Sequence, residues 1–119
     1  MMIVYGLANC DNTRAAIKRL KQAKISFALH DYKEHGLEEK LLKKWLMYIP
    51  LEKMLNKKST AWRELPFVLQ AKATTEAGAV QLMREYPNLV KRPLIEWSDG
   101  DYTIGFDEKM IESKINVQD

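Results

Sequence analysis

The sequence is poor in the residues that form disulfides, bind metals or interrupt regular structure. Its 119 residues include one cysteine, two histidines, four prolines and five glycines. A single cysteine excludes an internal disulfide, so folding does not depend on oxidation and the chain suits a reducing compartment. Neither His30 nor His35 has a Cys, Asp or Glu partner at zinc-ligand spacing, so the sequence predicts no metal site.

Long hydrophobic runs are also absent. No segment approaches the ~18 apolar residues of a membrane span, and the start MMIVYGLANC lacks the regions of a signal peptide. We therefore expect a cytoplasmic protein that does not bind membranes. The net charge of +3 is too small to predict nucleic-acid binding. The length and the 46% of hydrophobic residues predict one globular domain over residues 1–119.

Apolar periodicity predicts a β-α-β opening. Residues 2–5 (MIVY) form a short apolar run typical of a buried strand. From Asn12 onwards, apolar residues repeat every three or four positions, which predicts an amphipathic helix. Residues 25–32 (ISFALHDY) alternate as a second strand. Such a unit joins parallel strands, and the loops at their carboxyl ends commonly hold ligands.

The rest of the chain predicts helices followed by a hairpin. Residues 37–49 repeat apolar side chains on one helical face and end at Pro50. Short helical turns follow, and Thr74 and Thr75 open a further helix. Asp99-Gly100 between two apolar runs is a hairpin signal, and a last helix starts at Asp107. The predicted order is β-α-β, helices, then β-β-α.

The one cysteine, Cys10, lies where the first predicted strand gives way to the first predicted helix. A thiol is nucleophilic as the thiolate, which the first turn of a helix stabilises; the alternative is a small buried hydrophobe. Thr13 stands where a C-x-x-C motif has its second cysteine, so an outside thiol such as glutathione must resolve an oxidised Cys10. Asp11 opposes the thiolate, and basic residues must outweigh it.

Candidate basic partners occur later in the chain. They are Lys57, Lys58, Arg63 and the Lys91-Arg92 pair, which precedes Pro93 and would present Arg92 to an anion. The alternative for each is a solvated surface charge. No glycine-rich phosphate loop, G-x-S-x-G motif or Rossmann fingerprint occurs.

Six segments together resemble the ArsC family, the arsenate-reductase-like branch of the thioredoxin superfamily. The resemblance is closest to YffB-type proteins and more distant to Spx, and it rests on YGLANCDNTRAA, HDYKEHGL, LLKKWL, MLNKKSTAWREL, LMREYPNLVKRPL and IGFDE. It implies an α/β (α+β) protein with a thioredoxin-like fold, a four-stranded mixed sheet and an inserted helical segment. It also implies that Pro93 is cis and faces Cys10.

The resemblance also implies a chemistry. Arsenate reductases of the family attack arsenate with a cysteine at the position of Cys10, discharge the adduct with glutathione, recycle through glutaredoxin and hold the oxyanion with three arginines. Arg92 matches one arginine, whereas Asn56 or Lys57 and Gly105 or Phe106 stand at the other two positions. A lysine lacks the planar fork that suits an oxyanion. A glutathione-dependent thiol reductase is therefore favoured, with arsenate reduction as the alternative.

The predicted oxidoreductase site has Cys10 as catalytic nucleophile. Substrate or glutathione would contact Asn9, Thr13, Lys57, Lys58, Arg92 and Pro93. Glutathione would be a co-substrate, with no bound cofactor or metal. Glutaredoxin and a small-molecule or protein-thiol substrate would be the partners of a monomer.

Two hypotheses from other classes stay open. One is an Spx-type regulator that binds RNA polymerase, although Thr13 removes the C-x-x-C switch of such proteins. The other is a thioredoxin-like binding module whose cysteine is inert.

Overall fold

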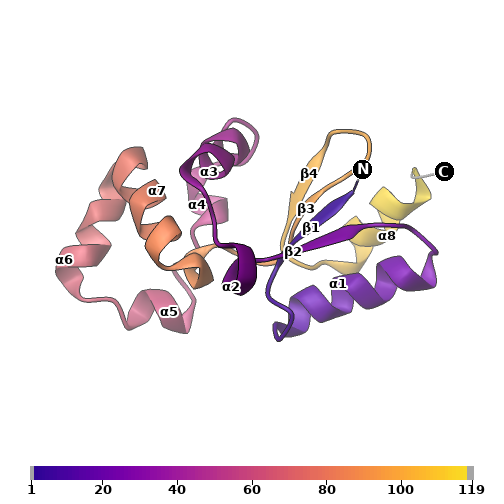
Figure 1. The fold of residues 1–119 in the computed structure, drawn as a ribbon, viewed down its shortest axis with the longest axis horizontal. Helices are drawn as coiled ribbons and strands as arrows, with labels where there is room; N and C mark the ends of the chain where they lie inside the picture. The colour runs from indigo at the N-terminus through magenta and orange to yellow at the C-terminus, as the bar shows by residue number, and fades with distance from the viewer. Residues whose placement is uncertain (1, 118–119) are drawn as a thin grey trace. The chain divides into compact units, whose positions relative to one another are not determined.

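The computed structural model describes residues 2–117 and divides the chain into two compact units (Figure 1). Among the described residues, the first unit comprises residues 2–34 and 92–117, and the second comprises residues 35–91. The first unit therefore combines the two ends of the chain, and the second is an insertion between them.

A four-stranded sheet forms the first unit. Its spatial order is β2-β1-β3-β4, made by β1 (Ile3–Gly6), β2 (Ala28–Asp31), β3 (Leu94–Glu96) and β4 (Tyr102–Ile104). β1 pairs parallel with β2 and antiparallel with β3, and β3 pairs antiparallel with β4. The predicted mixed sheet with an inserted helical segment is confirmed.

Helices α1 (Asp11–Gln22) and α8 (Glu108–Asn116) contribute buried apolar side chains to the core of this unit. Alternate residues of β1 and β3 contribute to the core because successive side chains of a strand point to opposite faces. The fully or almost fully buried cluster consists of Met2, Val4, Ala16, Leu20, Ile95, Trp97 and Ile111. Each large apolar side chain buried in this way contributes about 1.5–3 kcal/mol of stability.

A left-handed residue ends helix α1. Lys24 has φ 58°, the N–H of Ile25 donates to Leu20 O at 3.0 Å, and that of Lys24 donates to Lys21 O at 3.0 Å. These two bonds define a Schellman motif, which usually has glycine in the left-handed position. The motif ends at Ile25, the first residue predicted as strand, and β2 begins only at Ala28.

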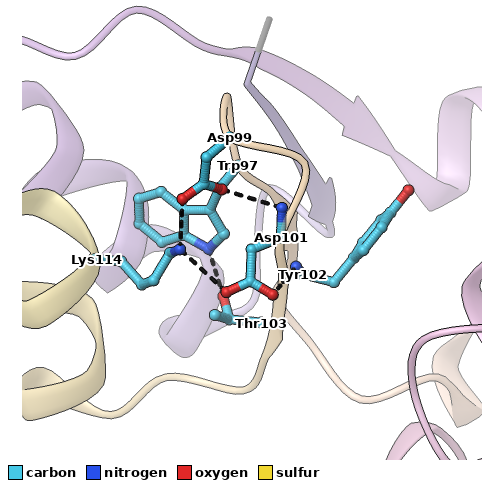
Figure 2. Close-up of polar contacts among 6 residues, drawn as sticks. All are labelled: Trp97, Asp99, Asp101, Tyr102, Thr103 and Lys114. Atoms are coloured by element: carbon cyan, nitrogen blue, oxygen red, sulfur yellow. Dashed lines mark hydrogen bonds and ion pairs between the residues drawn. The ribbon is translucent and has the colours of Figure 1, made fainter. Parts of the chain in front are cut away.

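The β3–β4 hairpin is tied to α8 by one lysine (Figure 2). Lys114 Nζ lies 2.9 Å from Asp99 Oδ2, 3.0 Å from Asp101 Oδ2 and 5.7 Å from the centroid of the Trp97 ring. Trp97 Nε1 donates to Thr103 Oγ1 at 2.8 Å. Burial lowers the pKa of Lys114, but the two aspartates outweigh it and the net pKa is raised.

The second unit is helical. After α2 (Tyr32–His35), where the two units meet in sequence, it contains α3 (Glu39–Leu46), α4 (Leu51–Met54), α5 (Thr60–Arg63), α6 (Phe67–Gln70), η1 (Ala71–Thr74), α7 (Glu76–Glu85) and η2 (Pro87–Leu89). Ser59 and Thr75 cap α5 and α7, accepting from Trp62 N and Gly78 N. None of the helices formed by residues 2–117 has both the length and the apolar character needed to span a bilayer.

The helix predicted over residues 37–49 is shorter than expected. Helix α3 ends at Leu46, and the N–H groups of Tyr48 and Ile49 both donate to Trp45 O. Pro50 disfavours helical geometry in the residue before it, so the last turn tightens before the proline. Pro50 then becomes the N-cap of α4.

Candidate active site

The loop after β1 places Cys10 at the N-cap of helix α1. Cys10 has extended backbone angles (φ −87°, ψ 128°), and its carbonyl accepts from Arg14 N at 2.9 Å. Its N–H donates to Leu7 O at 3.0 Å, which closes the loop as a tight turn. The side chain is half-buried. Its sulfur therefore stands beside the unpaired N–H groups and the positive end of a twelve-residue helix.

Asp31 fixes the same loop from the neighbouring strand. Its Oδ2 accepts from Ala8 N at 3.0 Å, and its Oδ1 accepts from Lys33 N at 2.7 Å. Asp31 is paired with Gly6 in the parallel β1–β2 register, so its carboxylate lies where β1 ends. One side chain thus holds both the cysteine loop and the first turn of α2.

Thr13 is the buried polar residue nearest to the thiol in sequence. The residue is fully buried, with an exposed fraction of 0%. Both its backbone N–H and its hydroxyl act on Cys10 and lower the pKa of the thiol. The contact of Thr13 with substrate or glutathione stays a prediction.

Arg92 and Pro93 approach the thiol from the start of β3. The Arg92–Pro93 peptide bond is cis, as the family resemblance implied, and Pro93 is buried. The Arg92 side chain hydrogen-bonds to Cys10 and lowers the pKa of the thiol through this bond and through its charge. β3 pairs with β1 so that Leu94 lies opposite Tyr5, and this register brings Arg92 to the cysteine loop.

Opposing effects act on the Cys10 thiol. Burial raises its pKa, whereas hydrogen bonds from the Thr13 N–H, the Arg92 side chain and the Thr13 hydroxyl lower it; the net direction is downward. The Asp11 carboxylate, expected to oppose the thiolate, is exposed and forms an ion pair with Arg14. The site is therefore built to hold a thiolate.

The remaining predicted site residues, Asn9, Lys57 and Lys58, are exposed. Asn9 is exposed in the cysteine loop. Lys57 and Lys58 are exposed residues of the second unit, where Lys57 Nζ lies 5.4 Å from the centroid of the Trp62 ring. Their contribution to a glutathione pocket stays a prediction. No group of three His, Cys, Asp or Glu side chains within residues 2–117 is arranged to hold a metal.

Gly105 occupies one of the positions where the family resemblance expected an arginine. Its φ is +81°, and its N–H donates to Pro93 O at 2.8 Å. A buried left-handed glycine bonded to the proline of the site supports the loop through its backbone alone.

Sequence reasoning did not identify Tyr32 as a site residue. Tyr32 begins α2, is 1% exposed, and interacts electrostatically with Arg92, Tyr5 and Cys10. It also missed the anchoring role of Asp31. Their positions could have indicated these roles, because both residues stand at the carboxyl end of the strand parallel to β1, where ligand sites commonly lie.

The fold and the site define a thioredoxin-like protein with one cysteine at the start of its first helix. The model of the ArsC family matches residues 5–113, so the chain belongs to the ArsC family.

Known proteins are similar to this one in sequence or structure over nearly the whole chain. An uncharacterized protein of Haemophilus influenzae is 37% identical over 109 residues, which cover 92% of this chain and 94% of that protein. The structure is similar to that of the YFFB (PA3664) protein, with a TM-score of 0.90, 29% identity and coverage of 97% and 99%. An arsenate reductase (ArsC) related protein from Brucella melitensis gives a TM-score of 0.74, 35% identity and coverage of 94% and 92%.

Proposed function

We propose that the chain is a glutathione-dependent thiol reductase with Cys10 as its nucleophile. The observation that carries the proposal is the position of a half-buried thiol at a helix N-terminus, where Thr13 and Arg92 lower its pKa. A lowered pKa increases the fraction of the reactive thiolate at neutral pH. Membership of the ArsC family supports an oxidoreductase of this kind.

The reaction needs one protein sulfur and an external thiol. The Cys10 thiolate attacks the glutathione sulfur of a mixed disulfide, forms a Cys10–glutathione disulfide and releases the substrate sulfur as a thiolate. A second glutathione thiolate then attacks the adduct, leaves as oxidised glutathione and regenerates the Cys10 thiolate. Cys10 is the one cysteine of the sequence, so an internal dithiol cycle is not available.

Glutathione suits the charges of the site. Its carboxylates require cationic partners, and Arg92 offers planar paired donors next to the sulfur. Lys57 and Lys58 would supply further positive charge, as the sequence predicts. Glutaredoxin would be an alternative reductant of the adduct.

The test is incubation of the purified protein with oxidised glutathione, followed by intact mass and a glutathione-coupled disulfide reductase assay. We expect a single glutathione adduct on the wild type, none on Cys10→Ser, and no turnover by that variant. Full activity in Cys10→Ser, or a wild type that forms no adduct, would contradict the proposal. In the latter case the chain would be a binding module, and capture of RNA polymerase subunits would indicate the Spx-type alternative.

Arsenate reduction is the second candidate, supported by the family and by Arg92. Gly105 or Phe106 stands where the family resemblance implies an oxyanion-binding arginine, which favours the disulfide substrate. Steady-state rates with arsenate and with a glutathione mixed disulfide decide between the two. We expect the disulfide to be the faster substrate.

A further inference from the structure

Tyr32 carries a buried hydroxyl that the fold itself does not use. The residue is 1% exposed, and within residues 2–117 its hydroxyl has no hydrogen-bond partner. Buried polar groups are nearly always hydrogen-bonded, so an exception calls for a physical explanation.

The position of Tyr32 relates this hydroxyl to the cysteine. Its electrostatic neighbours are Arg92, Tyr5 and Cys10. Thr13 and Arg92 hydrogen-bond to the Cys10 sulfur, but Tyr32 does not. Tyr32 is therefore an electrostatic neighbour of the thiol but not one of its hydrogen-bond partners. A donor in this position is suited to an atom that a ligand brings.

Thiol–disulfide exchange brings such an atom close to Cys10. The attacking, central and leaving sulfurs are arranged in line, so the leaving sulfur lies roughly 4–5 Å from the attacking one, about two S–S bond lengths. This separation exceeds hydrogen-bond reach from Cys10 but lies within the range of its electrostatic neighbours. Thr13 and Arg92 hydrogen-bond to the attacking sulfur of Cys10, whereas the Tyr32 hydroxyl is available to bond to the leaving sulfur.

We propose that the Tyr32 hydroxyl donates a hydrogen bond to the sulfur that leaves when Cys10 attacks a glutathione disulfide. This rests on the proposed function. The Cys10–sulfur bond forms, the substrate S–S bond breaks, and the electron pair goes to the departing sulfur. Burial raises the pKa of Tyr32 above that of a thiol, so the proton stays on the phenol and the leaving group departs as a hydrogen-bonded thiolate.

The experiment compares Tyr32→Phe with the wild type in two reactions of Cys10. Alkylation by iodoacetamide as a function of pH reports the thiolate and its pKa, and it requires no sulfur leaving group. Glutathionylation by oxidised glutathione requires one. We expect unchanged alkylation and a roughly tenfold slower glutathionylation, the effect of losing one hydrogen bond to the departing thiolate.

A second disulfide makes the role specific. Ellman's reagent releases an aromatic thiolate that is already a good leaving group, so it needs less assistance. We expect Tyr32→Phe to slow this reaction much less than glutathionylation. The control is Tyr86→Phe, which removes an exposed phenol of the second unit and should preserve all three rates.

Three results of these reactions would overturn the inference. They are equal glutathionylation rates in Tyr32→Phe and the wild type, equal slowing with both disulfides, or a raised Cys10 pKa. A lower thermal midpoint for Tyr32→Phe would also overturn it, because it would reveal a structural partner for the hydroxyl; loss of an unpartnered hydroxyl leaves stability equal or higher. If the wild type itself forms no adduct, the proposed function fails first.

Discussion

Gly6 lies directly against the side chain of Thr13. A Cβ atom at residue 6 would stand 2.5 Å from Thr13 Oγ1 and 2.9 Å from its Cγ2, both too close for non-bonded atoms. The last residue of β1 thus leaves room for the hydroxyl that lowers the pKa of Cys10. The absence of a side chain at position 6 is part of the thiol site.

We therefore predict that Gly6→Ala alters both stability and chemistry. Overpacking should lower the free energy of unfolding by about 1–3 kcal/mol. Displacement of Thr13 should also raise the pKa of Cys10, measured from the pH dependence of its alkylation. Gly100→Ala is the control: its φ of +87° makes alanine strained, but nothing lies within 4 Å of the added atom. That variant should lose stability and keep the thiol pKa.

Arg92 should affect the thiol through both charge and geometry. In Arg92→Gln the charge and the guanidinium bond are lost, so the Cys10 pKa should rise and alkylation at neutral pH should slow several-fold. Arg92→Lys keeps the charge but lacks the planar donors, so its Cys10 pKa should lie between those of the wild type and Arg92→Gln. Lys91→Gln, an exposed neighbour, is the control. If the pH–rate profiles of Cys10 alkylation in the wild type, Arg92→Gln and Arg92→Lys superimpose, this role of Arg92 is refuted.

The same pKa shift predicts how stability depends on pH. The folded-state pKa of Cys10 is below its unfolded value, so between the two values the unfolded state binds more protons. The extra stability is complete above the unfolded pKa, about 8.5, and is lost as pH falls through the folded pKa. In urea denaturation, the free energy of unfolding of the wild type should increase relative to that of Cys10→Ser as the pH rises from neutral to mildly alkaline. If the difference in free energy of unfolding between the two proteins does not change with pH, the lowered Cys10 pKa is contradicted.

Lys24 offers a stabilising substitution away from the site. It is the one non-glycine residue with positive φ among the described residues, and it occupies the left-handed position of a Schellman motif. Lys24→Gly should increase the free energy of unfolding by about 0.5–1 kcal/mol. Lys21→Gly, within the last turn of the same helix, should instead lower it by a similar amount. Denaturation midpoints of the two variants should move in opposite directions.

Lys114 should stabilise the hairpin over a defined pH range. Its pKa is raised by Asp99 and Asp101 against the opposing effect of burial, so its contribution is complete below the unfolded pKa of about 10.4 and is lost as pH rises through the folded pKa. Lys114→Met should cost about 1 kcal/mol at neutral pH. Lys109→Met, on the exposed side of the same helix, should cost much less. Equal thermal midpoints for the two variants would refute the prediction.

The elements marked by strong local signals were predictable from the sequence. The apolar run before Gly6, the threonines before α7 and the Asp99-Gly100 turn each determine local backbone structure, and the structure confirms them. The limits of β2 and α3 were less well predicted. Those limits depend on the Schellman turn at Lys24 and on the tightened turn before Pro50, and both arise from competition between hydrogen-bonding patterns.

The site was predictable where sequence neighbours create it. Cys10 and Thr13 belong to one helix start, and Arg92 was recognised because it precedes a proline that matches the family pattern. Asp31 and Tyr32 were missed because their roles depend on the register of β2 against β1. A one-residue change of register would turn their side chains to the other face of the sheet.

The pairing of β1 with β3 joins two groups that are distant in the chain. Cys10 and its helix form from one local segment, but Arg92 reaches the sulfur only when β3 has docked beside β1. Thiol acidity is thus a readout of completed long-range assembly. Before β3 pairs with β1, Cys10 should have an ordinary pKa and react slowly with an alkylating probe. The rate of alkylation during refolding would therefore report when the two strands pair.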